Sequence, residues 1–251
     1  MLVIRDDQRV ALRQHRLASF AERMTSHLMD FAPRHAETIG RERMGAVVQR
    51  GIRDAEAAGF DTVGPVRLYL ELMCLFGSYF GTDPQLPWAG EILRAGFTDD
   101  QAARADALHR RSGRFLSDVF GPGNIHGRAA LMALSDWARQ PRPLPDSGFE
   151  AAASSGVAAI WPQRYACAGD GALRALAARA RAEADARGLA TDRGRTLVFI
   201  LMLGFGHGFA DDPLFPWFSE DGLRDRVADP AERLEARMQA YLAVMMRRAG
   251  R

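Results

Sequence analysis

Residues 72–88 read LMCLFGSYFGTDPQLPW, and residues 201–217 read LMLGFGHGFADDPLFPW. The two stretches align without a gap at an offset of 129 residues, and 9 of their 17 positions are identical. Unrelated segments of this length would share about one position, so the chain is expected to be a tandem duplication. The identical pairs are Leu72/Leu201, Met73/Met202, Phe76/Phe205, Gly77/Gly206, Phe80/Phe209, Asp83/Asp212, Pro84/Pro213, Pro87/Pro216 and Trp88/Trp217.

The repeat extends well beyond these two stretches. The same offset pairs Gly59 with Gly188 and Pro33 with Pro162, and it reaches back to Phe20 and Phe149. Each unit then has about 110 residues, which is far longer than the 20–50 residues of a solenoid repeat. We therefore expect two small helical domains, or two halves of one.

A proline-rich stretch is the expected boundary between the two units. Three prolines within five positions, at 141, 143 and 145, fix φ and remove backbone donors, so a helix cannot continue through them. We predict a first helical repeat with a trailing helix over 1–139, a linker over 140–147 and a second helical repeat over 148–251.

The spacing of apolar residues predicts an all-α fold. Apolar residues recur three to five positions apart across 7–31, and a second amphipathic helix is expected over 41–58. Residues 66–80 are apolar almost all round, which is typical of a buried central helix, and 197–209 is its counterpart in the second repeat. No stretch alternates as a strand does, so we expect a pseudo-symmetric helical bundle.

The composition argues against several classes of partner and indicates a cellular compartment. All 33 basic residues are Arg, and they are interspersed with 31 acidic ones, which argues against a nucleic-acid partner. No apolar run approaches the ~20 residues of a membrane span, and the N-terminus lacks the apolar core of a signal peptide. The two cysteines, Cys74 and Cys167, are not a disulfide framework. The protein is expected in the cytoplasm.

The paired Asp-Pro and Pro-Trp turns are the main candidate site. An Asp before Pro is typical of a helix N-terminus, where the carboxylate accepts unpaired N–H groups, and each Trp would pack on the central helix. Alternatively, the two turns are the edges of a binding groove with the Trp side chains as anchors. With one histidine, the candidate binding residues are Asp83, Pro84, Trp88, Asp212, Pro213, Trp217 and His207.

His207 lies in a glycine-rich run, Gly204-Phe205-Gly206-His207-Gly208. This run does not follow a strand and open a helix, as a dinucleotide-binding fingerprint must. His207 aligns with Ser78, so we interpret it as a satisfied interior histidine, with a ligand role as the alternative. The sequence contains no HExxH, GxSxG or P-loop motif, and we expect no catalytic residues, no metal and no cofactor.

The first repeat resembles a family of uncharacterised bacterial proteins whose genes tend to lie beside type VI secretion clusters and their spike-tip or toxin genes. The resemblance covers mainly residues 1–95, and that pattern is best known as a single copy. It is carried by Ile4-Arg5, Arg16, Phe20, Arg23-Met24, His27-Leu28, Phe31, Gly40, Gly51-Ile52, Leu72-Met73, Phe76-Gly77, Phe80, Asp83-Pro84 and Leu86-Pro87-Trp88.

The resemblance implies an accessory role in loading or guarding a secreted effector. We expect a non-catalytic cytoplasmic adaptor or chaperone whose partner is a secreted effector, a toxin or a spike-tip protein. One alternative is an immunity protein that neutralises a cognate toxin, although such proteins usually carry a strongly charged face. The other is a small-ligand-binding protein or enzyme that uses the groove between the repeats, with Asp83, Asp212 and His207.

Overall fold

The computed structural model describes residues 6–94, 100–139, 144–216 and 232–240. Within these ranges the chain is helical and contains no strand, which confirms the all-α prediction. We call residues 1–139 the first half and residues 148–251 the second half. The first half contains α1 (Asp6–Phe31), α2 (Pro33–Ala57), α3 (Val63–Phe76), η1 (Phe80–Thr82), α4 (Pro87–Arg94), α5 (Gln101–Phe120), η2 (Pro122–Asn124) and α6 (Ile125–Arg139). The second half contains α7 (Phe149–Ile160), α8 (Pro162–Ala168), α9 (Asp170–Ala186), α10 (Asp192–Phe205), η3 (Phe209–Asp211) and helical residues 232–240.

Helix bounds recur at the offset of 129 residues. The pairs α3/α10 and η1/η3 begin and end at aligned positions, α1 and α7 end at aligned positions, and α2 spans the positions aligned with α8 and α9 together. The backbone of α2 bends at Gly40 (φ 73°, ψ 171°), and the aligned Gly169 (φ 82°, ψ 156°) separates α8 from α9. These matches support the predicted duplication.

The central helices α3 and α10 are buried, as expected, but they end earlier than the apolar pattern predicts. The sequence predicts a helix over 66–80, whereas α3 spans Val63–Phe76. Gly77 and the aligned Gly206 both adopt φ 91° and ψ 155°, a conformation that L side chains rarely adopt and that stops each helix. The apolar residues that follow continue into η1 and η3 instead.

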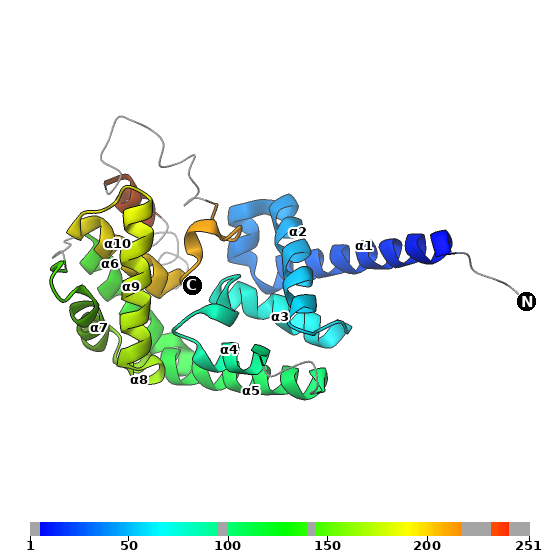
Figure 1. The fold of residues 1–251 in the computed structure, drawn as a ribbon, viewed down its shortest axis with the longest axis horizontal. Coiled ribbons are helices and arrows are strands. Elements are labelled where there is room, and N and C mark those ends of the chain that lie inside the picture. The colour runs from blue at the N-terminus through cyan, green and yellow to red at the C-terminus, as the bar shows by residue number, and fades with distance from the viewer. Residues whose placement is uncertain (1–5, 95–99, 140–143, 217–231, 241–251) are drawn as a thin grey trace, which may run out of the picture.

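Buried hydrophobic residues of both halves form one continuous core cluster. The largest cross-connection packs α8 against α5, where the Trp161 ring lies edge-on to Phe120 with centroids 5.5 Å apart. The Trp161 Nε1–H also donates to the Val119 carbonyl oxygen at 3.2 Å. In Figure 1, α6–α10 gather on the left, α1–α4 lie on the right and α5 runs along the lower edge.

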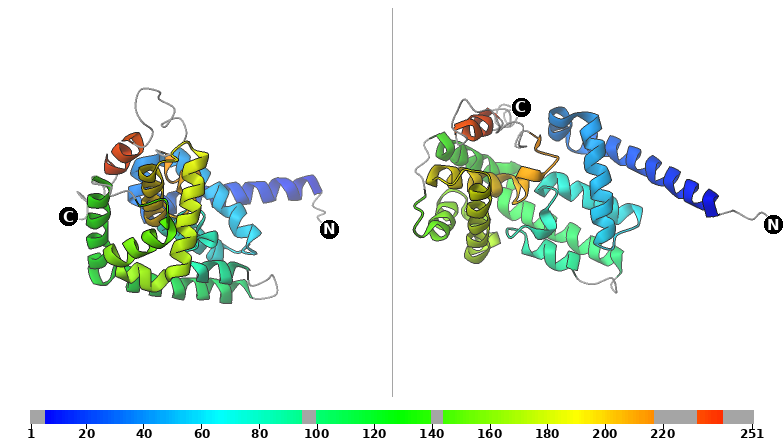
Figure 2. Two further views of the ribbon diagram at one scale, coloured as in Figure 1. Left: turned by 60° about the vertical axis from the view of Figure 1, so that its left-hand side comes forward. Right: turned by 45° about the horizontal axis from the view of Figure 1, so that its top comes forward.

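The first part of α1 stands clear of the body of the molecule in both Figure 1 and Figure 2. Residues 15–19 are all exposed, and Phe20 is partly buried and packs against the core. Among the helices that the structure describes, none is long and apolar enough to cross a membrane.

Candidate functional site

The C-terminal ends of α3 and α10 meet at a contact that we call the helix-end crossing. A Cβ atom added to Gly77 would lie 2.9 Å from the Phe205 carbonyl oxygen, and one added to Gly206 would lie 3.0 Å from the Phe76 carbonyl oxygen. Each position therefore requires glycine for two reasons: its φ is positive, and the two backbones approach closely. The crossing places the two aligned stretches side by side.

The two candidate carboxylates tie the halves together at this crossing. Asp83 Oδ2 accepts the main-chain N–H of His207 at 2.9 Å. Asp212 accepts from Ser78 in the same way, with Oδ2 to the main-chain N–H at 2.7 Å and Oδ1 to the hydroxyl at 2.6 Å. Both side chains are buried, with relative exposures of 4% for Asp83 and 3% for Asp212. Both carboxylates therefore connect the two halves from buried positions.

Each carboxylate also stabilises its own turn. Asp83 Oδ1 accepts the N–H of Gln85 at 2.8 Å, and Asp212 Oδ1 accepts the N–H of Leu214 at 3.0 Å. The sequence interpretation identified the carboxylate as an acceptor of main-chain N–H groups, but it placed Asp83 at a helix N-terminus, whereas α4 begins only at Pro87. It also missed the second bond, which comes from the other half. Burial alone would raise the pKa of Asp83, yet the hydrogen bonds from His207 and Gln85 outweigh it and hold that pKa below its ordinary value.

His207 is a largely enclosed side chain of the crossing. Its Nδ1 lies 3.5 Å from Asp83 Oδ2, and its Nε2 is 3.2 Å from the Thr82 hydroxyl oxygen. The ring stands edge-on to Tyr79 with centroids 6.0 Å apart. The interior position agrees with the sequence interpretation, but only Nε2 is hydrogen-bonded: the buried Nδ1 has no hydrogen-bond partner among the described residues, so the ring is not fully satisfied.

The other predicted site residues divide into core and turn positions. Trp88 is buried, with its ring against Phe76 of α3 and Phe115 of α5, which agrees with the packing interpretation. Pro84 and Pro213 are partly exposed in the two turns, and Trp217 lies outside the described residues.

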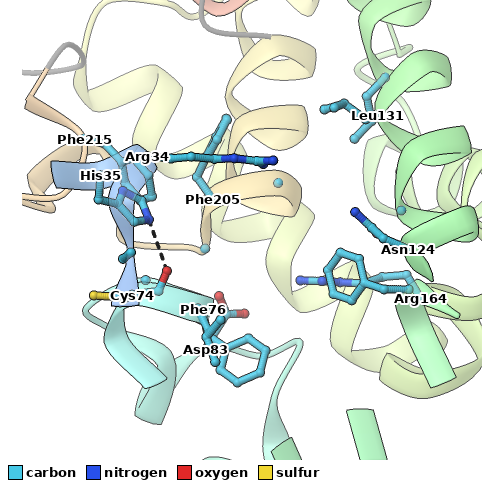
Figure 3. Close-up of a pocket in the computed structure, with 18 of the residues that line it drawn as sticks. Arg34, His35, Cys74, Phe76, Asp83, Asn124, Leu131, Arg164, Phe205 and Phe215 are labelled. Atoms are coloured by element: carbon cyan, nitrogen blue, oxygen red, sulfur yellow. Dashed lines mark hydrogen bonds between the residues drawn. The ribbon is translucent and has the colours of Figure 1, made fainter. Parts of the chain in front are cut away.

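A cavity of about 480 Å³ lies beside the helix-end crossing (Figure 3). Residues of both halves line it, and among the predicted site residues that the structure describes, only Asp83 reaches it. The polar part of its lining consists of Arg34, His35, Asp83, Asn124, Arg128 and Arg164. Its apolar walls include Phe76, Phe120, Leu131, Trp161, Phe205 and Phe215.

Two of the polar lining residues, His35 and Arg164, occupy aligned positions of the two halves. His35 Nε2 donates to the Cys74 carbonyl oxygen at 3.1 Å, and Arg164 Nη2 donates to the Leu203 carbonyl oxygen at 3.4 Å. Cys74 and Leu203 are also 129 residues apart. The alignment of the two halves pairs these residues, but because each pair differs in residue type, a search for identical residues did not identify them.

Arg164 is a buried cation, with a relative exposure of 7%. Its Nε and Nη2 donate to the Gln85 side-chain oxygen at 3.1 and 2.9 Å, and its guanidinium lies over the Trp161 ring at 5.1 Å. Burial lowers the pKa of Arg164 to about 10, and the negative charge of Asp83 opposes that shift. The side chain therefore stays protonated at neutral pH.

His35 lines the same cavity and keeps one nitrogen as an acceptor. Burial lowers the pKa of His35, an effect that the hydrogen bond to the Cys74 carbonyl and the charge of Asp212 only partly offset. Because Nε2 donates to that carbonyl, Nδ1 of the neutral ring is left as an acceptor. The ring stands edge-on to Phe215 with centroids 5.6 Å apart.

The described part of the chain offers no cluster of three or more His, Cys, Asp or Glu side chains that could hold a metal ion. The cavity instead combines guanidinium groups, an amide and aromatic walls, a chemistry suited to binding. No protein-family model matches the chain, and neither curated proteins nor solved structures gave a significant match.

Proposed function

We propose that the protein is a non-catalytic cytoplasmic accessory, an adaptor or chaperone, that binds a type VI secretion effector or spike component. The resemblance of residues 1–95 supplies the class of partner. The structural observation that carries a protein-binding role is the free-standing first part of α1 (Figures 1 and 2).

A helical segment without tertiary contacts is marginal in water, because most helical stability in proteins comes from packing one face against a neighbour. The sequence of α1 keeps apolar residues at helical spacing, including Val10 and Leu17, into the part that stands clear of the body. Leu17 has a relative exposure of 47%. An amphipathic helix of this kind binds another helix or a groove of a partner protein through apolar anchors.

The structure favours a docking site on α1 over one at the paired Asp-Pro and Pro-Trp turns. Asp83 and Asp212 are buried and bonded to main-chain N–H groups, which supports a structural role and leaves neither carboxylate accessible to a partner. The same bonding favours a non-catalytic protein over an enzyme that uses Asp83, Asp212 and His207.

Co-purification tests the proposal. The tagged full-length chain is expressed in its native host, and the product of the neighbouring effector gene is sought in the eluate. The variant Leu17→Glu should lose the partner, whereas Met132→Glu, at an exposed position of α6 with a relative exposure of 60%, should retain it. A wild type that retains no effector or spike protein would overturn the proposed function, and equal retention by both variants would exclude α1 as the contact.

A toxicity assay separates the adaptor from the immunity alternative. An immunity protein should restore growth of cells that produce the cognate toxin, whereas an adaptor should bind the toxin without restoring growth.

A further inference from the structure

We propose that the cavity beside the helix-end crossing binds a small organic anion, with its carboxylate or phosphate group held by arginines and its apolar body against the aromatic walls. This inference is independent of the proposed function, because it rests on the cavity and does not involve α1.

The charge of the lining favours an anion. Arg34, Arg128 and Arg164 bring three positive charges, and Asp83 brings the single carboxylate of the lining. The oxygens of Asp83 already accept hydrogen bonds from His207 and Gln85, so this carboxylate is not available as a bidentate partner for the arginines. Figure 3 shows Arg34 and Arg164 entering the cavity from opposite sides, with the Asn124 side chain close by.

Arg164 provides the anchoring donor. Its hydrogen bonds use Nε and Nη2, and Nη1 makes no hydrogen bond to any residue in the described ranges. A guanidinium presents its donors in a planar fork that matches a carboxylate or phosphate. Nη1 is not one of the fully enclosed donors of the described residues, and Arg164 lines the cavity, so an anionic oxygen in the cavity can accept from it.

Arg164 is also held rigidly in place. Gln85 accepts from it, and the same Gln85 side chain donates to the Met202 carbonyl oxygen at 3.1 Å. The guanidinium carbon lies 5.1 Å from the centroid of the Trp161 ring and 5.3 Å from that of Phe115. A donor that is fixed before the ligand arrives loses little side-chain entropy on binding.

The walls and the volume indicate an organic ligand rather than a bare inorganic ion. Phe76, Leu131, Phe205 and Phe215 present apolar surface to the cavity, and an inorganic ion would leave that surface uncovered. A volume of about 480 Å³ lies within the roughly 300–1,000 Å³ of small-molecule sites. The ligand class is therefore an aliphatic or aromatic acid or phosphate ester.

Four probes with one tail and different headgroups test this inference on the full-length chain: octanoate, octyl phosphate, octanol and octylammonium. Isothermal titration calorimetry should give the two anions a Kd about tenfold or more below that of octanol, since one charge-assisted contact is worth about that factor. Octylammonium should bind no better than octanol. The ratio of the two anion affinities distinguishes a carboxylate site from a phosphate site.

Variants locate the binding. Arg128 is exposed, so Arg128→Gln should fold normally and weaken both anions about three- to tenfold while leaving octanol unchanged. Arg111→Gln on the exposed surface of α5 is the matched control and should change nothing. Arg164→Lys keeps the charge but loses the planar fork, and it should weaken the anions further, with circular dichroism to verify folding. Equal affinity for all four probes, anion binding that is insensitive to both Arg128→Gln and Arg164→Lys, or no binding of either anion would overturn the inference. None of these results would bear on effector binding through α1.

Discussion

Asp83 accepts the main-chain N–H of His207 from the other half of the chain at 2.9 Å. The aligned Asp212 accepts the main-chain N–H of Ser78, which aligns with His207, at 2.7 Å. Such an exchange, in which residue i contacts residue j and the counterpart of j contacts the counterpart of i, is generated by a twofold axis and not by a translation. The helix-end crossing therefore has local twofold geometry, and this favours two halves joined face to face.

Replacing either carboxylate should loosen this crossing. Asp83→Asn and Asp212→Asn each put an NH₂ group where one oxygen accepted an N–H, so a buried donor loses its partner. We expect each variant to lower the free energy of unfolding by about 1–3 kcal/mol, the usual cost of an unsatisfied buried group. Urea unfolding followed by circular dichroism measures this. Asp106→Asn, at an exposed position of α5, is the control and should be close to neutral. Unchanged stability in both Asp83→Asn and Asp212→Asn would show that these hydrogen bonds do not stabilise the crossing.

The glycines of the crossing should be less replaceable than other positive-φ glycines. Gly77→Ala and Gly206→Ala add a Cβ 2.9–3.0 Å from a backbone oxygen of the other half. Gly40→Ala and Gly169→Ala also sit at positive φ but meet no atom within 4 Å, so they isolate the backbone strain of about 1–3 kcal/mol. We expect the crossing variants to lose more stability than these controls in the same urea experiment. Equal losses at all four positions would show that the close approach costs nothing.

The sequence predicted the fold class well because helices follow from the spacing of apolar residues within short segments, and the two halves could be aligned by identical residues. The all-α class, the buried central helices and the recurrence of helix bounds follow from residue spacing. The end of α3 was misplaced by four residues because its apolar run continues past the helix into η1. The glycine that stops the helix, Gly77, was visible in the sequence, but the apolar pattern outweighed it.

The site was predicted less well because it depends on contacts between distant residues. Asp83 and Asp212 were correctly identified as acceptors, but their partners 124 and 134 residues away could not be read from local patterns. The cavity was missed because alignment by identity emphasises matching residues. His35 and Arg164 are aligned and make equivalent main-chain contacts, yet they differ in type and gave no signal.

Trp88 should be a core residue of the first half. Trp88→Ala removes a ring that packs against Phe76 and Phe115, and we expect a loss of about 3–5 kcal/mol, typical of large aromatic truncations. Trp88→Phe should cost much less, because the buried Nε1 has no hydrogen-bond partner among the described residues. Thermal melts would measure both, with Val63→Ala at an exposed position as the control. A negligible shift in Trp88→Ala would favour an interface role for the ring.

His35 should make the protein less stable in mild acid. Its pKa is lowered in the folded chain, mainly by burial, so the unfolded chain binds the proton more readily. Its contribution is fully present above the ordinary pKa of 6.5 and is lost as pH falls from there through the folded pKa. Urea unfolding between about pH 5 and 7 should show this decline, which His35→Gln should reduce and His109→Gln on the exposed surface of α5 should not. The pKa of Asp83 is lowered from its ordinary value of 3.8, so the stability that Asp83 contributes is fully present above pH 3.8 and stays constant between pH 5 and 7. A decline that is the same in wild type and His35→Gln would assign it to other groups.

The two cysteines should differ sharply in reactivity. Burial raises the pKa of Cys74 to about 12, and its side chain is nearly inaccessible, whereas Cys167 is exposed. A disulfide reagent such as Ellman's attacks through the thiolate, and at pH 8 a group of that pKa is ionised to only about one part in ten thousand. We therefore expect one fast-reacting thiol per native chain and two in denaturant. Cys167→Ser should abolish the fast phase and leave Cys74 to react only when the chain opens. Fast modification of Cys74 in native Cys167→Ser would mean that the region around α3 and the cavity opens freely in solution.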